Sequence, residues 1–313
     1  MMIVLLEDLG VPEQVIERHA QTLKAMGHHF LAYPKDADPA VQLERSRDAD
    51  VIVLANMPLN ASVVREAKNL KFIDVAFTGV DHIPMAEAKE KGIAVSNASG
   101  YATQAVAELS VSFMIQLLRN IAKTEQRCRT GGTKDGLVGS LLCGKTVGIV
   151  GAGAIGRRTA ALCKAFDCRV IAYSRSKVTD PVFDAQMPLE QLLGQADIVS
   201  LHCPLTPQTK GLIGKEQLSA MKKNAILINT ARGGVVDTAA LAAALNSGTI
   251  AGAACDVFEA EPPLPADHPL LHTPNTIVTP HIAFASAESM ERRAEIVFEN
   301  LYSWLDGKQI NCI

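Results

Sequence analysis

The strongest constraint on the fold is a glycine pattern that directly follows a short apolar segment. The segment Lys145–Val150 is rich in β-branched residues, and Gly151, Gly153 and Gly156 follow it before Arg157–Phe166, which has a helical composition. In such a strand–turn–helix unit, the first glycine permits a tight turn, the second lets the backbone approach a pyrophosphate, and the third lets the helix pack closely on the strand. The N-terminus of the helix then offers N–H groups to phosphate. The residues predicted to line this dinucleotide site are Gly151, Gly153, Ala154, Ile155 and Gly156.

Strand-like and helix-like segments alternate along the whole chain. The strand candidates of the first hundred residues are Ile3–Leu6, Val51–Leu54, Phe72–Ala76 and Ile93–Val95. The six later candidates are Thr146–Val150, Arg169–Tyr173, Ile198–His202, Ala225–Asn229, Gly252–Val257 and Thr276–Val278. Six strands separated by helices match a doubly wound parallel sheet, whose ligands bind beyond the carboxyl ends of the strands. A long helix over Ala102–Lys123 is predicted between the two groups, and an amphipathic helix over Ala287–Leu305 ends the chain.

These segments predict an α/β fold with two βα domains. One is a Rossmann-type domain with a doubly wound parallel sheet, over residues 99–286. The other is a smaller, flavodoxin-like substrate domain that is discontinuous in sequence, because the last helix is expected to pack back on it. Its predicted residues are 1–98 and 287–313.

Composition excludes several classes of partner. The net charge of −3 over 313 residues gives no electrostatic footprint for nucleic acid or an anionic membrane. The apolar start of the chain stops at Glu7 and Asp8 without a basic region, so it is predicted to be a strand and not a signal peptide. The seven cysteines are scattered without a C-x-x-C pair, which favours reduced thiols and a cytoplasmic protein. No metal site is predicted.

Three further segments end predicted strands or follow them closely, namely Asn229–Asp237, Asp256–Pro263 and Thr279–Phe284. Together with the glycine pattern, and in this order, they resemble the D-isomer-specific 2-hydroxyacid dehydrogenases. The resemblance covers nearly the whole chain. It implies that Arg232, Glu261 and His281 form the catalytic set.

The chemistry of 2-keto acid reduction fits these residue types. The reaction needs a hydride from nicotinamide to the carbonyl carbon and a proton to its oxygen, and histidine is the natural proton donor near neutral pH. A carboxylate such as Glu261 favours the imidazolium form of His281 and fixes its orientation. The guanidinium of Arg232 can hold the substrate carboxylate or polarise the ketone. Glu259 is a nearby competitor for the role of Glu261.

The resemblance also implies contacts with cofactor and substrate. The implied cofactor contacts outside the glycine loop are Thr103, Ser174, Arg175, Ser176, His202, Pro204, Thr230, Ala231, Asp256, His281 and Ala283. The loop with Thr78, Gly79 and Val80 resembles the one whose backbone N–H groups bind the substrate carboxylate, beside Arg232 and His281. Asn56 and Met57 are suggested as side-chain selectors by their position just past a predicted strand. The histidines expected to be structural or exposed are His28, His29, His82, His268 and His272.

The end of the second strand of the nucleotide domain departs from the NAD pattern. An acidic residue about twenty positions past the glycines would bond the ribose 2′-hydroxyl of NAD. Ser174 stands there, and Arg175 and Lys177 follow it. A carboxylate would repel a 2′-phosphate, whereas serine and arginine would bind it. The sequence therefore favours NADP(H), with NAD(H) left open.

Within the family, the segment Ala283–Ser286 resembles the glycerate and hydroxypyruvate/glyoxylate reductase branch. Hydroxypyruvate or glyoxylate is the favoured substrate, and a D-lactate-like or branched 2-keto acid dehydrogenase is the alternative. A nucleotide-sensing protein similar to the dimeric corepressors of this fold is the alternative from another class, and formate dehydrogenases are a further enzymatic one. The resemblance implies a homodimer joined largely through the long helix and the nucleotide domain.

Overall fold

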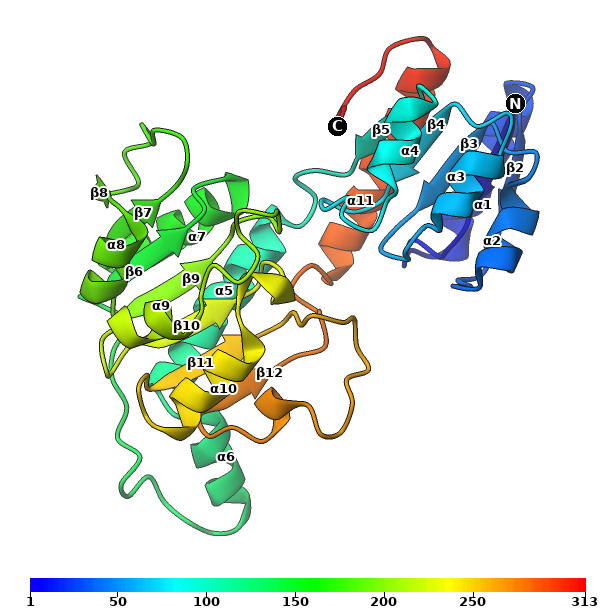
Figure 1. The fold of residues 1–313 in the computed structure, drawn as a ribbon. Coiled ribbons are helices and arrows are strands. Elements are labelled where there is room, and N and C mark those ends of the chain that lie inside the picture. Colours follow the sequence, from blue (N-terminus) through cyan, green and yellow to red (C-terminus); the bar gives the residue numbers. More distant parts are fainter. The chain divides into compact units, whose positions relative to one another are not determined.

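The computed structural model describes residues 1–313 as two compact units. Unit 1 comprises Met1–Ala102 and Ala285–Ile313, and unit 2 comprises Thr103–Phe284. Each unit contains one parallel sheet with helices on both faces, as Figure 1 shows. The fold class is therefore α/β with two βα units, the first of them discontinuous in sequence. The assignment of substrate to one unit and cofactor to the other stays a prediction.

Unit 1 contains a five-stranded sheet in the order β2-β1-β3-β4-β5, which is the flavodoxin-like order. Its strands are β1 (Met2–Leu5), β2 (His29–Ala32), β3 (Val51–Leu54), β4 (Phe72–Val75) and β5 (Ala94–Asn97). Its helices are α1 (Glu13–Ala25), α2 (Pro39–Ser46), α3 (Ala61–Glu66), α4 (Met85–Glu90) and α11 (Ala287–Leu305). Every residue of β3 and β4 is buried, as expected for parallel strands covered on both faces. One face carries α2, α3 and α4, and the other carries α1 and α11 (Figure 1).

The last helix joins unit 1 through aromatic packing. Phe298 of α11 stacks on His19 of α1, with ring centroids 3.7 Å apart, and Trp304 stacks on Phe72 of β4 at 4.9 Å. The tail beyond α11 then bonds the edge strand β5, since Asn97 N donates to Asn311 O at 3.1 Å. The amphipathic helix predicted over Ala287–Leu305 therefore belongs to the same unit as the first residues of the chain.

Unit 2 contains a seven-stranded sheet in the order β12-β11-β10-β9-β6-β7-β8, which extends the Rossmann order by one strand. Its strands are β6 (Thr146–Val150), β7 (Arg169–Tyr173), β8 (Ala185–Gln186), β9 (Ile198–Leu201), β10 (Ile226–Asn229), β11 (Gly252–Cys255) and β12 (Thr276–Val278). Its α-helices are α5 (Thr103–Leu118), α6 (Ile121–Arg129), α7 (Ala154–Ala165), α8 (Leu189–Gln195), α9 (Lys215–Ala220) and α10 (Thr238–Asn246), with short 3-10 helices η1 (Gly233–Val235) and η2 (Pro269–Leu271).

The prediction of a single long helix over Ala102–Lys123 is wrong. This segment forms two helices, because α5 ends at Leu118 and meets α6 at a bend of 62°. Asn120 adopts φ +53° at the break, a left-handed conformation that asparagine tolerates better than most residues. Gly139 packs against the end of α5, where a Cβ atom would lie 2.4 Å from Leu118 O. Contacts with this later segment, which no local periodicity encodes, therefore fix the bend.

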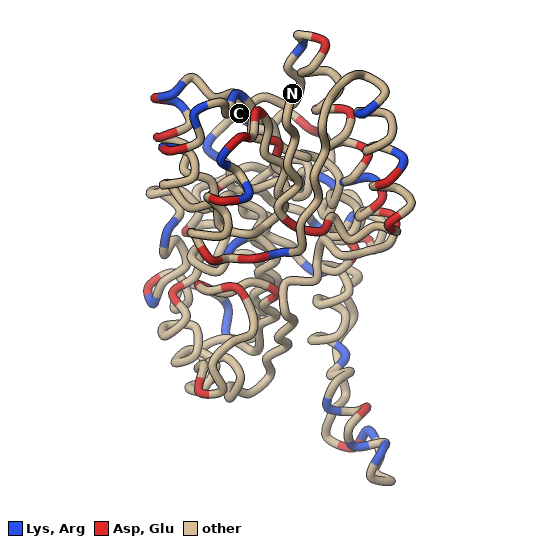
Figure 2. Tube along the Cα trace, turned by 90° about the vertical axis from the view of Figure 1, so that its right-hand side faces the viewer, with Lys and Arg blue, Asp and Glu red and all other residues tan.

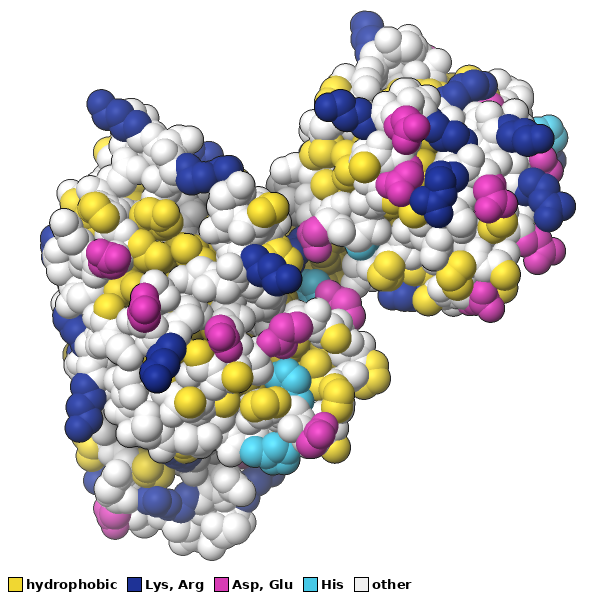
Figure 3. Space-filling model, viewed as in Figure 1, with side chains coloured by type: hydrophobic (Ala, Val, Ile, Leu, Met, Phe, Trp, Pro, Cys, Tyr) yellow, Lys and Arg dark blue, Asp and Glu magenta, His cyan; other side chains and the backbone are white.

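Lys and Arg positions are interspersed with Asp and Glu positions along the trace in Figure 2, and the face in Figure 3 mixes both kinds with hydrophobic side chains. No group of three His, Cys, Asp or Glu side chains is arranged to hold a metal ion. No single helix is both long and apolar enough to cross a membrane; only the bent pair α5 and α6 together passes on length and composition.

Candidate active site

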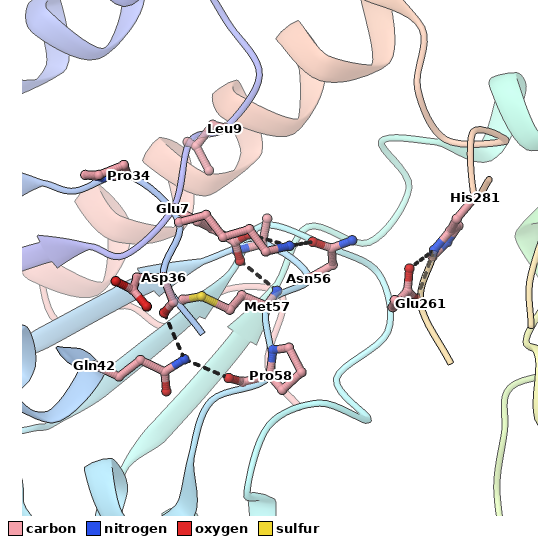
Figure 4. A network of polar contacts seen from close by, with 12 residues as sticks. Glu7, Leu9, Pro34, Asp36, Gln42, Asn56, Met57, Pro58, Glu261 and His281 are labelled. Atoms are coloured by element: carbon pink, nitrogen blue, oxygen red, sulfur yellow. Dashed lines mark hydrogen bonds and ion pairs between the residues drawn. The ribbon is translucent and has the colours of Figure 1, made fainter. Parts of the chain in front are cut away.

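His281 and Glu261 form a hydrogen-bonded pair in unit 2. The Nδ1 atom of His281 lies 2.9 Å from Oε2 and 3.1 Å from Oε1 of Glu261 (Figure 4). A carboxylate only accepts, so Nδ1 carries the hydrogen in this pair and proton exchange with a ligand falls to Nε2. The ring of Phe284 meets the imidazole edge-on, with centroids 5.3 Å apart. The His281 side chain is 11% exposed and that of Glu261 57% exposed, so the pair is reachable from solvent.

Asp256 holds the loop that carries His281. His281 adopts φ +57°, which is uncommon for a residue other than glycine, and its N–H donates to Asp256 O at 2.8 Å. The buried Asp256 carboxylate accepts from Ile282 N at 2.9 Å, from Ala283 N at 2.8 Å and from the Thr279 hydroxyl at 2.5 Å. Burial raises the pKa of Asp256, and these three donors oppose that effect. The same aspartate thus fixes both sides of the unusual His281 backbone.

Glu259, the competitor expected for the role of Glu261, faces a different histidine. Its Oε2 lies 3.5 Å from Nε2 of His268, and the His268 ring packs edge-on against Phe258 at 5.4 Å. Unit 2 therefore contains two histidine–carboxylate pairs. Glu261 is the carboxylate that contacts His281.

Arg232 follows the strand β10. The side chain of Asn229 shapes this turn, because its amide accepts from Ala231 N and donates to Arg232 O, both at 3.1 Å. A Cβ atom at Gly233 would lie 1.9 Å from the carbonyl carbon of Phe258, so this turn packs directly on the chain that leaves β11. Because β10, β11 and β12 are parallel neighbours, the segments with Arg232, Glu261 and His281 leave the same edge of the sheet.

The glycine loop has the shape that a pyrophosphate requires. Gly151 adopts φ +103°, and a Cβ atom there would lie 2.7 Å from Cys203 N. At Gly156 a Cβ atom would lie 2.1 Å from Gly151 O, whereas at Gly153 it would meet no atom within 4 Å. The helix α7 begins at Ala154 without a side-chain cap, so its first N–H groups remain available to an anion. These features fit a dinucleotide at Gly151, Gly153, Ala154, Ile155 and Gly156.

The loop after β7 contains Ser174, Arg175 and Ser176, and sequence reasoning missed the residue that orders it. The side-chain amide of Gln186 in β8 donates to Ser174 O at 3.1 Å and to Ser176 O at 2.8 Å. It also accepts from Val178 N at 2.8 Å. Three bonds from one side chain therefore fix the backbone on both sides of Arg175.

The remaining predicted cofactor contacts are distributed over the same unit. Thr230 is buried and its hydroxyl lies 2.9 Å from that of Ser110. Burial lowers the pKa of His202 to about 3, so this ring is neutral. The Nε2 atom of His202 lies 2.9 Å from the Ser200 hydroxyl, whereas Nδ1 has no partner in the chain. Thr103 begins α5, while Pro204, Ala231, Asp256 and Ala283 all lie in segments that follow strand ends.

In unit 1, Thr78, Gly79 and Val80 follow β4, and their backbone N–H groups donate to no acceptor in the chain. Asn97 supports this loop by donating to Thr78 O at 2.7 Å. The prediction that the Met57 side chain selects substrate is wrong, because that side chain is fully buried in the core. The Met57 backbone N–H donates to the Glu7 carboxylate. No pattern in the sequence around Glu7 predicts this bond.

Comparisons with known proteins define the class. The family model described as the NAD binding domain of D-isomer specific 2-hydroxyacid dehydrogenases matches residues 111–283. A glyoxylate reductase from Thermofilum pendens is 39% identical over 309 residues, which cover 95% of this chain and 90% of the relative. A glycerate dehydrogenase from Methylorubrum extorquens is 39% identical over 301 residues, covering 91% and 92%. The solved structure of an acyclic imino acid reductase with NADPH and D-Arg superimposes with a TM-score of 0.92 at 28% identity, covering all of both chains.

The chain therefore belongs to the D-isomer specific 2-hydroxyacid dehydrogenase family. It is an oxidoreductase that uses a nicotinamide cofactor on small 2-keto or 2-hydroxy acids.

Proposed function

We propose that this enzyme reduces hydroxypyruvate or glyoxylate to the corresponding 2-hydroxy acid, with His281 as the acid/base, Glu261 as its partner and Arg232 as the substrate anchor. The observation that carries the proposal is the bond of 2.9 Å between His281 Nδ1 and the Glu261 carboxylate. Support for the substrate class comes from the similar glyoxylate reductase, glycerate dehydrogenase and a hydroxypyruvate reductase from Blautia hydrogenotrophica, 33% identical over 282 residues.

The side chains divide the work of ketone reduction. A bound nicotinamide supplies the hydride to the carbonyl carbon. His281 donates a proton from Nε2 to the carbonyl oxygen, and the Glu261 carboxylate orients the ring by accepting from Nδ1. Arg232 binds the substrate carboxylate through its planar guanidinium. In unit 1, the unbonded N–H groups of Thr78, Gly79 and Val80 also suit a carboxylate, because backbone donors in a turn form an anion-binding concavity.

We propose NADP(H) as the preferred cofactor, with NAD(H) as the weaker one. The carboxylate that would repel a 2′-phosphate is replaced by Ser174, and Arg175 next to it provides a guanidinium for that phosphate. The bonds from Gln186 support this reading, because a fixed loop loses less entropy when it binds a ligand.

We also propose a cytoplasmic homodimer, joined through α5 and the segments beside it. After α6 the chain leaves two apolar side chains open to solvent, Val138 at 81% and Leu141 at 66% exposure. These two side chains would lose their contact with water if a second copy covered this segment. Light scattering of the purified chain measures this directly, and a mass of one chain at micromolar concentration contradicts the dimer.

The catalytic assignment is tested with a matched pair of histidine variants. His281→Ala should lower the rate of hydroxypyruvate reduction by about 100-fold or more, the usual contribution of a general acid. NADPH binding, followed by its fluorescence, should change little. His268→Ala is the control, since His268 also faces a carboxylate in unit 2. Near-normal turnover of His281→Ala, or an equal loss in both variants, would contradict the assignment.

A further inference from the structure

A buried glutamate organises the carboxyl edge of the unit 1 sheet. Glu7 follows β1 and is only 3% exposed. Its Oε1 atom accepts from Ala55 N at 2.7 Å and from Met57 N at 2.8 Å, so it binds the chain on both sides of Asn56 (Figure 4). A buried carboxylate is stable only when such donors and a nearby cation satisfy it. Because both N–H groups bind Oε1, the other oxygen of Glu7 faces a different partner.

That partner is Lys35, which follows β2. Its Nζ atom lies 3.7 Å from Oε2 of Glu7 and donates to Oδ1 of Asn56 at 3.3 Å. The Asn56 carbonyl oxygen therefore already accepts one bond, and the NH₂ group of the amide provides two donors for a ligand. The ammonium has three N–H groups and a side chain that is 55% exposed. Lys35 and Asn56 consequently offer mainly donors at this edge of the sheet.

We propose that Lys35 and Asn56 form a specificity-determining donor pair that binds the C3 hydroxyl oxygen of the substrate. The inference rests on the proposed reduction of small 2-keto acids and names the substituent that the site selects. Asn56 follows β3, and the N–H groups of Thr78–Val80, which suit the substrate carboxylate, follow the adjacent strand β4. Neighbouring strands lie about 4.8 Å apart, which is comparable with the length of a three-carbon acid. A carboxylate at the β4 loop therefore leaves C3 within reach of the β3 loop.

The charges favour a hydroxyl group over a second carboxylate. Glu7 places a negative charge beside the Lys35 ammonium, so the pair supplies donors with little net positive charge. Because Glu7 offsets the charge of Lys35, a second carboxylate on the substrate would gain little net attraction there, whereas a neutral hydroxyl needs only the donors. A methyl group at C3 would leave the donors without an acceptor, which lowers affinity.

Hydroxypyruvate and pyruvate test this pair, because they differ only in the C3 hydroxyl, and glyoxylate lacks C3 altogether. Lys35→Met keeps the length of the side chain and removes its donors. The ratio of kcat/KM for hydroxypyruvate to that for pyruvate should fall about tenfold, through KM for hydroxypyruvate, the effect of one lost hydrogen bond to a charged group. The kinetics with glyoxylate, which has no C3, should stay unchanged, and those with pyruvate should not worsen, because its methyl group no longer faces the Lys35 donors.

Two further variants separate selection from folding. Glu7→Gln keeps an acceptor for Ala55 and Met57 but turns an NH₂ group toward Lys35, so it should lower the same ratio. The buried NH₂ group has no acceptor, so Tm should also fall, and the ratio is measured at a temperature where this variant is still folded. Lys71→Met is the control, because Lys71 is 56% exposed and also pairs with a carboxylate, that of Asp50 at 2.8 Å, at the start of β4. This control should keep the wild-type ratio.

The outcomes distinguish the two proposals. An active wild type with an unchanged ratio in Lys35→Met, or an equal loss for all three acids, overturns the donor pair and leaves the proposed function standing. A wild type that reduces none of the three acids overturns the proposed function and the donor pair together.

Discussion

Replacing Asp256 by asparagine is expected to loosen the loop that carries His281. The carboxylate accepts three hydrogen bonds, two from backbone N–H groups and one from the Thr279 hydroxyl. An asparagine oxygen at the Oδ1 position keeps the bonds from Thr279 and Ile282. The new NH₂ group then faces the N–H of Ala283, which loses its acceptor.

The size of the effect follows from that single unsatisfied donor. A buried N–H without an acceptor costs about 1–3 kcal/mol, and Asp256 is fully buried, so about 2 kcal/mol of unfolding free energy should be lost. For a unit of this size, about 2–4 °C of Tm corresponds to each kcal/mol, which gives a decrease of about 4–8 °C. His281 should also lose its fixed position, so kcat should fall about tenfold or more.

Circular dichroism melting and the rate of hydroxypyruvate reduction measure the two effects on the same preparations. Asp237→Ala is the control: Asp237 is an exposed N-cap that accepts from Ala240 N at 2.9 Å in the same unit. It should cost about 1 kcal/mol and leave kcat unchanged. An Asp256→Asn protein with wild-type Tm and kcat would refute the role given to this carboxylate.

Three other variants probe separate parts of the account. Glu261→Gln removes the charge from the bond between His281 and the half-exposed Glu261 side chain. After screening, about 1 kcal/mol, or about fivefold in kcat, should be lost; an unchanged kcat contradicts the pairing. Arg175→Ala should raise KM for NADPH at least tenfold more than KM for NADH, and equal changes mean that Arg175 does not read the 2′-phosphate. Burial raises the pKa of Asp74 well above its ordinary value of 3.8, against a bond of 2.9 Å from Asn300. The protonated form therefore stabilises the protein below the unfolded pKa, and this contribution is lost as pH rises above it. Asp74→Asn should flatten that fall of unfolding free energy in denaturant titrations from about pH 4 upward; an identical pH slope contradicts this.

The sequence predicts the parts of the fold that have a periodic or glycine signature. The buried strands β3 and β6 and the glycine loop have such signatures, because fully covered parallel strands are continuous apolar runs. The edge strand β2 escaped prediction because only one of its four residues is even partly buried, and β8 because it has two residues. The bend at Asn120 depends on packing by Gly139, which lies outside any local window.

In the candidate site, too, the sequence predicts some residues and misses others. The segments with Arg232, Glu261 and His281 follow predicted strands, so their shared sheet edge follows from the parallel topology. Glu7 and Gln186 were missed because each bonds backbone groups of another segment: Glu7 is 48 residues from Ala55. The burial of Met57 was also missed, since position past a strand does not say which way a side chain points.

The most direct test of the account is the initial rate of hydroxypyruvate reduction by the purified chain, with NADPH and NADH compared side by side. NADPH should be oxidised at a substantial rate, and the reaction with NADH should be markedly slower. A faster reaction with NADH would contradict the reading of Ser174 and Arg175. A chain that binds nucleotide but reduces neither hydroxypyruvate nor any other 2-keto acid would contradict the central claim and favour a nucleotide-sensing binding protein.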